Sequence, residues 1–151
     1  MGARSVFCAL ALVACQSAAT EPRQRLELRP APPDVADLAG VVQTELANAR
    51  RDGKQLLVYV GADWCEPCKR FHEAAVAGQL DAELGTVRLL ELDNDKHLDA
   101  LHRAGYRSSL IPLFAVPNPD GTASGKQIEG SIKGDGAVAN ITPRLRALLV
   151  Q

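Results

Sequence analysis

The sequence has no excess of charge of either sign. Its 151 residues include 17 Lys and Arg against 18 Asp and Glu, which gives a formal net charge of -1. A nucleic-acid binder usually carries a basic stripe, so this balance argues against such partners. The length suits one domain, and the 46% of apolar residues are typical of a folded chain rather than a disordered one.

Long apolar runs are also missing. None approaches the roughly 20 residues that a membrane-spanning helix needs. The run over residues 5–14 follows a single charge at Arg4, which is typical of the short basic and apolar regions of a secretory signal segment.

The end of this run resembles the lipobox of bacterial lipoproteins. The motif is Leu-Val-Ala-Cys and ends at Cys15. The resemblance implies that a signal peptide over residues 1–14 is removed and that Cys15 becomes the lipidated first residue. The alternatives are an ordinary signal peptide cleaved near Ala18 or Ala19, and a buried apolar helix. Several acyl chains on one residue would anchor the protein stably, because each buried CH₂ contributes about 0.8 kcal/mol.

Residues 15–33 contain the lipidation site and then a polar, Pro-rich stretch without a sustained apolar period. Such a composition predicts an extended tether between the membrane and a domain over residues 34–151. The alternative is that Leu26 and Leu28 belong to an additional strand.

The apolar spacing after the tether predicts an α/β domain with a central mixed β-sheet flanked by helices. A βαβ unit is followed by a β-hairpin and a C-terminal helix. Asp34 and Thr142 are expected to cap the first and last helices, with Pro143 in the first turn of the last one. The three histidines are expected to be exposed helix residues. The expected elements are helix 34–49, strand 55–60, helix 65–77, strand 86–92, helix 97–104, strand 110–116, strand 126–131 and a helix from 142.

Cysteine is scarce, and four residues do not make a disulfide framework. Cys8 and Cys15 fall in the N-terminal segment, so Cys65 and Cys68 remain as a pair. Residues i and i+3 lie one above the other on a helix, so the two sulfurs can approach bonding distance. Cys65 is expected at the helix N-terminus, where unpaired N–H groups favour the nucleophilic thiolate. Pro67 would destabilise the first turn of the helix little, because the N–H that proline lacks has no intrahelical partner there.

Two other interpretations of the pair remain open. A structural zinc site needs four ligands, and the sequence has no second cysteine pair; His72 could join, but His97 and His102 belong to another element. A purely structural disulfide closing so short a loop would stabilise little. The pattern therefore favours thiol–disulfide exchange, without metal or cofactor.

At these residues the chain resembles the thioredoxin superfamily. Residues 64–69 match its W-C-x-P-C-K motif, Ile111-Pro112 matches its cis-proline, and Gly130 fits the glycine before its last helix. The residues around the motif are most similar to the thioredoxin-like domain of periplasmic Dsb-type reductases. Cys-Glu-Pro-Cys also resembles the thiol reductases of cytochrome c maturation. The resemblance implies a thioredoxin fold and a protein-disulfide oxidoreductase.

The resemblance also implies individual roles. Cys65 attacks a substrate disulfide, and Cys68 resolves the mixed disulfide. Trp64 shields one side of the pair, unless it is a core aromatic. Pro112, as a cis residue, faces the pair and leaves the neighbouring backbone free for an extended substrate; a trans proline at a strand start is the alternative. The supporting residues within the two motifs are Trp64, Glu66, Pro67, Lys69, Ile111 and Pro112.

One position departs from the family pattern. Thioredoxins carry a buried acid six residues before the first cysteine, and this chain has Tyr59 there. Tyr is a poor base at neutral pH, so the acceptor of the Cys68 proton is open, with Glu66 as a candidate. The negative charge of Glu66 would disfavour the Cys65 thiolate, and a higher pKa goes with a more reducing protein.

These observations lead to one expected function. We expect a monomeric lipoprotein in the bacterial cell envelope, anchored through Cys15 and facing the periplasm, that reduces protein disulfides. A reductant there must be recharged, so a transmembrane electron donor is expected as a partner. The alternatives are a disulfide oxidase or isomerase, and a non-catalytic module that binds a peptide or another partner in the groove beside Pro112.

Overall fold

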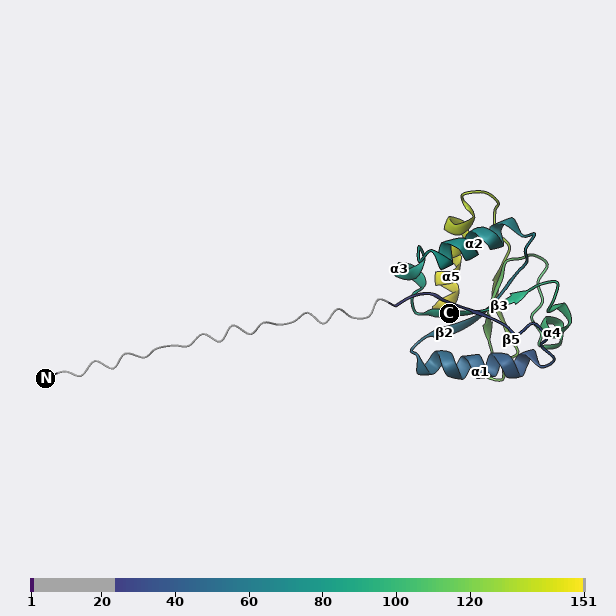
Figure 1. Cartoon of the computed structure of the whole chain (residues 1–151), viewed down its shortest axis with the longest axis horizontal. Helices are drawn as coiled ribbons and strands as arrows, with labels where there is room; N and C mark the ends of the chain where they lie inside the picture. The colour runs from purple at the N-terminus through teal and green to yellow at the C-terminus, as the bar shows by residue number, and fades with distance from the viewer. Residues whose placement is uncertain (2–23, 151) are drawn as a thin grey trace.

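A five-stranded mixed β-sheet forms the centre of the domain in the computed structural model, which describes Met1 and residues 24–150 (Figure 1). The strand order is β1-β3-β2-β4-β5; β1, β3 and β2 are parallel, while β4 is antiparallel to β2 and to β5. The elements are β1 (Glu27–Pro30), α1 (Leu38–Arg51), β2 (Gln55–Gly61), α2 (Glu66–Val76), α3 (Asp81–Leu84), β3 (Val87–Asp93), α4 (Leu98–Arg103), β4 (Leu113–Pro117), β5 (Ala123–Glu129) and α5 (Ala137–Leu149).

Helices cover both faces of the sheet (Figure 1). On one face, buried residues of α2, α3 and α5 form a core with alternate residues of the strands, including Phe71, Leu84 and Ile141. On the other face, α1 and α4 pack through Val42 and Leu101. Because β2 is covered on both sides, its run from Leu56 to Gly61 is buried without alternation, as expected of a central strand with helices on both faces. The predicted α/β class is confirmed.

The connection from β2 to α2 positions the cysteine pair. β2 ends at Gly61, and Cys65 then caps α2. Within α2, Phe71, Ala74 and Ala75 recur at helical spacing and are buried against the sheet. The pair therefore lies where the central strand ends, in the region where open α/β sheets place ligands.

The last helix begins earlier than predicted. α5 starts at Ala137, so the prediction that Thr142 and Pro143 open the helix is wrong. The Thr142 hydroxyl donates to the Val138 carbonyl at 2.9 Å. Ile141 and Leu145, on either side of the proline, are buried in the core, so packing outweighs the break that Pro143 would otherwise favour. At the start of α1, Asp37 rather than Asp34 accepts the N–H of Gly40 at 3.0 Å.

The prediction of a tether up to Pro33 is wrong for its second half. Residues 27–30 form β1, parallel to β3, and Leu26 is buried in the core. The alternative of an additional strand is therefore confirmed, and the domain begins before residue 34. The predicted signal peptide and the lipidation of Cys15 lie outside the described residues.

A buried guanidinium helps to hold β1 in place. The Arg88 side chain, on β3, is only 3% exposed and pairs with Glu27 and Asp52. Its Nε donates to Glu27 Oε2 at 2.8 Å. Burial opposes ionisation of Glu27. The hydrogen bond from Arg88 and the positive charges of Arg88, Lys54 and Arg29 outweigh this effect and hold the pKa of Glu27 below its usual value.

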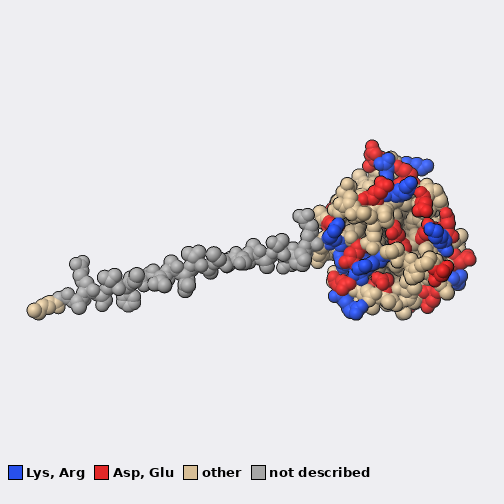
Figure 2. All heavy atoms as spheres, viewed as in Figure 1, with Lys and Arg blue, Asp and Glu red and all other residues tan. Residues whose placement is uncertain are grey.

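Acidic and basic side chains are interspersed on the face of the domain drawn in Figure 2. Within the described part of the chain, no helix is both long enough and apolar enough to cross a membrane.

Candidate active site

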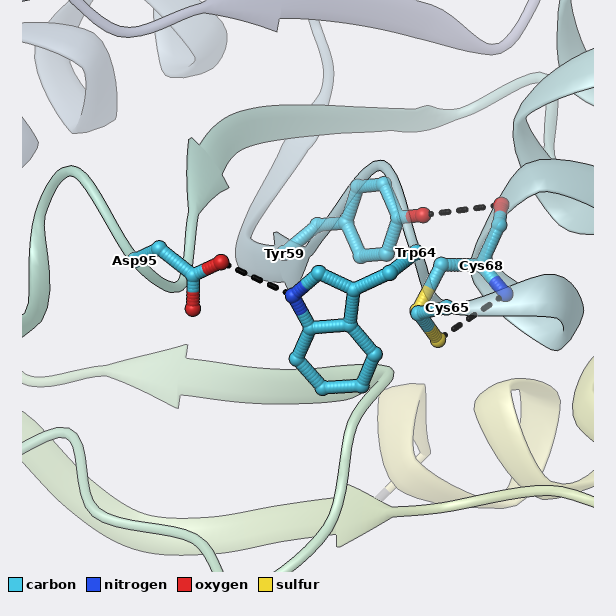
Figure 3. Close-up of a disulfide and its surroundings, with 5 residues drawn as sticks. All are labelled: Tyr59, Trp64, Cys65, Cys68 and Asp95. Atoms are coloured by element: carbon cyan, nitrogen blue, oxygen red, sulfur yellow. Dashed lines mark hydrogen bonds between the residues drawn. A yellow bond between two sulfur atoms is a disulfide. The ribbon is translucent and has the colours of Figure 1, made fainter.

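Cys65 and Cys68 are joined by a disulfide at the N-terminus of α2 (Figure 3). Their Cα atoms are 5.2 Å apart, and the Cys68 N–H donates to the Sγ of Cys65 at 3.3 Å. The prediction that these sulfurs reach bonding distance is confirmed. Pro67 occupies the first turn of α2, as predicted. The two cysteines are 4% and 3% exposed, so only a small part of the pair is open to a reaction partner.

The Ile111–Pro112 loop borders the pair from the other half of the sheet. The bond between these residues is cis, as predicted. Ile111 packs against the buried cluster that Ala62, Cys65 and Cys68 form. The Pro112 carbonyl accepts the N–H of Gly130 at 2.8 Å, which ties the loop to the end of β5.

Trp64 lies at the surface beside the disulfide (Figure 3). Trp64 is 67% exposed, so the alternative of a core aromatic is wrong. The indole Nε1–H donates to Asp95 Oδ2 at 2.8 Å, which links the loop before α2 to the loop after β3. Asp95 is not among the site residues predicted from the sequence.

Glu66 does not fit the role of proton acceptor. Its carboxylate pairs with Arg70 one turn along α2 and accepts the N–H of Gly134 at 3.2 Å. The Arg70 hydrogen bond is the main reason why the pKa of Glu66 lies below its usual value, and burial only partly opposes it. A carboxylate that holds its charge so firmly is a poor base. Arg70 also offsets the negative charge that Glu66 would present to Cys65.

Tyr59 supports the pair but cannot take its proton. The side chain is 1% exposed, and its hydroxyl donates to the Cys68 carbonyl at 3.2 Å (Figure 3). The ring stacks on Phe114 with centroids 4.8 Å apart and meets Phe71 edge-on at 5.6 Å. Burial, and to a lesser extent the charge of Glu91, raises the pKa of Tyr59 far above neutrality.

A cavity of about 400 Å³ opens beside Cys68, between α2 and the ends of β2 and β3. Tyr59, Cys68, Lys69, His72 and Glu91 are among its lining residues. The Nδ1 of His72 lies 2.7 Å from Glu91 Oε1. His72 is half-buried rather than exposed as predicted, and Glu91 is not among the residues predicted for the site. The sequence does carry one signal for Glu91, because it is a charged residue within the apolar run of β3. The strand register places it directly opposite Tyr59.

His97 is buried, so the prediction that it is exposed is wrong. Its Nε2 lies 3.0 Å from the carbonyl oxygen of Pro32, and its Nδ1 lies 3.0 Å from the backbone nitrogen of Asp93. Nε2 is therefore assigned as the donor to the carbonyl and Nδ1 as the acceptor from the amide. These bonds fix the loop that carries Asp95. His102 is exposed as expected. No cluster of three or more His, Cys, Asp and Glu residues able to hold a metal is found in the part of the chain that the structure describes.

The sheet order, the helix-capping disulfide and the cis Ile111–Pro112 bond together define a thioredoxin-like fold with a redox-capable cysteine pair. A family model described as thioredoxin-like matches residues 40–119, which include both motifs. The chain belongs to this thioredoxin-like family. A comparison with curated protein sequences finds no match.

Solved structures share the fold at low sequence identity. The thioredoxin of Trichomonas vaginalis is 17% identical, with a TM-score of 0.51, over 84% of this chain and 97% of that one. Fasciola hepatica thioredoxin is 20% identical, with a TM-score of 0.50, over 83% and 97%. The short form of spinach chloroplast thioredoxin f is 20% identical, with a TM-score of 0.50, over 82% and 92%. At this identity the likeness shows the fold, and the Cys65–Cys68 pair indicates a redox enzyme in general.

Proposed function

We propose that the protein is a thiol:disulfide oxidoreductase that reduces protein disulfides. The observation that carries the proposal is the Cys65–Cys68 disulfide at the N-terminus of α2, with Ile111 of the cis Ile111–Pro112 bond packed against its cluster. In the reduced protein, the Cys65 thiolate attacks a substrate disulfide and forms a mixed disulfide. Cys68 then attacks Cys65, releasing the substrate with two added electrons and regenerating the disulfide.

Exposed apolar side chains near the pair support a protein as substrate. Trp64, Leu110 and Ile132 are 67%, 60% and 55% exposed. Leu110 immediately precedes Ile111, which packs against the cluster that contains the cysteines. Ile132 belongs to the loop whose Gly134 N–H donates to Glu66. Apolar groups gathered around a reactive centre are typical of a surface that binds a partner.

The direction of electron flow rests on the resemblance to periplasmic reductases and on the local charge. Glu66 lies next to Cys65, although Arg70 offsets part of its effect. We expect a reduction potential near that of thioredoxin, about −270 mV. The measurement equilibrates the full chain, with Cys8 and Cys15 replaced by Ser, in graded thiol–disulfide buffers and counts free thiols by alkylation and mass.

Each other outcome of this titration favours a different function. A potential near −120 mV would make the protein a disulfide donor and reverse the direction. Absence of a reversible two-electron transition would refute the enzyme and favour a module that binds partners beside Pro112.

We further propose that the protein faces the periplasm from a membrane, anchored by lipid on Cys15, and receives electrons from a transmembrane donor. The lipobox-like motif ending at Cys15 supports the anchor. We expect wild type in the membrane fraction of a bacterial host and Cys15→Ser in the soluble fraction, because the variant cannot be acylated. Ser17→Ala is the matched control. Equal membrane retention of Cys15→Ser would contradict the anchor.

A further inference from the structure

Resolution of a mixed disulfide requires Cys68 to lose a proton. The thiolate is the nucleophile, and an isolated thiol ionises only at a pH of about 8.5. Cys68 is only 3% exposed, so bulk water has little direct access to take its proton. Neither Tyr59 nor Glu66 suits the role of acceptor, so the proton needs another route.

The cavity beside Cys68 offers that route. Its volume of about 400 Å³ is room for several water molecules at about 30 Å³ each. Cys68 and His72 both line it, one turn apart on α2. A water chain within the cavity can therefore connect Cys68 with the imidazole.

The pairing of His72 with Glu91 suits the imidazole to accept a proton. The contact of 2.7 Å joins Nδ1 to a carboxylate oxygen, so the ionised carboxylate accepts the Nδ1–H and leaves Nε2 as the basic nitrogen. The side chains of His72 and Glu91 are 43% and 26% exposed, so the pair can pass the proton on to solvent.

The other charged groups around the cavity fit the role less well. Asp93, on β3, accepts N–H groups of Asp95 and Lys96; these outweigh the effect of burial and hold its pKa below the usual value. Asp63, Lys69 and Glu73 also line the cavity but are exposed. An ammonium such as that of Lys69 has no acceptor site.

We propose that His72, oriented by Glu91, is the general base that deprotonates Cys68 during resolution of the mixed disulfide. The Cys68 S–H proton passes through cavity water to His72 Nε2. The Cys68 thiolate attacks Cys65 Sγ, so the Cys65–Cys68 bond forms and the bond from Cys65 to the substrate sulfur breaks. The substrate leaves as a thiolate that takes a proton from solvent, and His72 returns its own proton to solvent. This inference rests on the proposed function.

The test separates attack by Cys65 from resolution by Cys68. The full chain, with Cys8 and Cys15 replaced by Ser, is reduced and mixed with the aromatic disulfide dithiobis(nitrobenzoate) in a stopped-flow instrument. Cys65 releases one coloured nitrobenzoate thiolate as it forms the mixed disulfide, and Cys68 then releases the second. For His72→Gln at neutral pH we expect an unchanged first phase and a second phase slower by about 100-fold, the lower range for loss of a general base.

Further variants distinguish a base from a residue that only supports the fold. Glu91→Gln is expected to slow the second phase by a smaller factor, because Nε2 remains but loses its orienting partner. His102→Gln, on the exposed side of α4, is the matched control and keeps both rates. Added imidazole is expected to increase the rate of the second phase in His72→Gln but not in the other variants. In His72→Gln, this rate should also increase with pH over the range in which a thiol ordinarily ionises.

Two results would overturn the inference. A second phase in His72→Gln within twofold of wild type, with the first phase intact, would refute the base while leaving the proposed function standing. A second phase that is slow but insensitive to imidazole and to pH would assign His72 a structural role. Absence of both phases from the wild-type chain would instead refute the proposed function, and the inference with it.

Discussion

Replacement of Cys68 by Ser is expected to convert the protein from a catalyst into a trap for its substrates. Cys65 keeps its place as the N-cap of α2 and can still attack a disulfide. The hydroxyl introduced in place of the Cys68 thiol cannot displace the substrate sulfur, so the mixed disulfide persists. We expect disulfide reduction to fall by about a thousandfold, equivalent to about 4 kcal/mol in activation free energy. Turnover of a disulfide-bonded protein is measured with dithiothreitol as electron source. The mass of the trapped adduct is measured in a separate incubation without dithiothreitol, which would reduce the mixed disulfide.

Cys65→Ser provides the matched control for the trap. It is expected to lose turnover to the same extent but to form no adduct, because the attacking sulfur is gone. Adducts on Cys65→Ser, and none on Cys68→Ser, would reverse the two roles. Turnover above a tenth of the wild-type rate in either variant would contradict a mechanism that needs both sulfurs.

The position of the reactive pair could be predicted because its signals are local. A buried strand, a Trp-Cys-x-Pro-Cys motif and an amphipathic helix follow one another in residues 55–76, and each carries its own periodicity or capping signal. The facing Ile111–Pro112 loop follows from a resemblance rather than from the residues alone. Its placement against Cys65 depends on the pairing of β4 with β2.

Other features could not be predicted because they depend on contacts between distant segments. Nothing near His72 in the sequence indicates that Glu91, on the next strand, lies within hydrogen-bond distance. Pro143 is a strong local signal for a helix start, yet the buried Ile141 and Leu145 extend α5 back past it. The strand β1 has only four residues and adjoins prolines, so its composition predicts a tether. Its partner is β3, about sixty residues further along the chain.

The place of β1 in the sheet has a practical consequence for any shortened form of the protein. We expect a chain that begins at residue 34 to be much less stable than one that begins at residue 24. The shorter chain loses Leu26 from the core and the Glu27 partner of Arg88. It also turns β3 into an unpaired edge. Burial of one Leu side chain is worth about 1.5–3 kcal/mol, and breaking a buried ion pair costs about 3–5 kcal/mol.

These two free-energy losses do not simply add, because Asp52 remains beside Arg88 and the shortened chain can relax. Even so, a loss of about 4 kcal/mol would remove much of the roughly 5–15 kcal/mol that holds a typical domain folded. Urea denaturation followed by far-ultraviolet circular dichroism compares the two chains. A chain from residue 24 carrying Leu26→Ala and Glu27→Gln should fall between them, since it keeps the backbone pairing of β1 but loses the two side-chain contacts. Equal midpoints for the chains from residues 24 and 34 would mean that β1 contributes nothing to stability and that the domain does begin at Asp34.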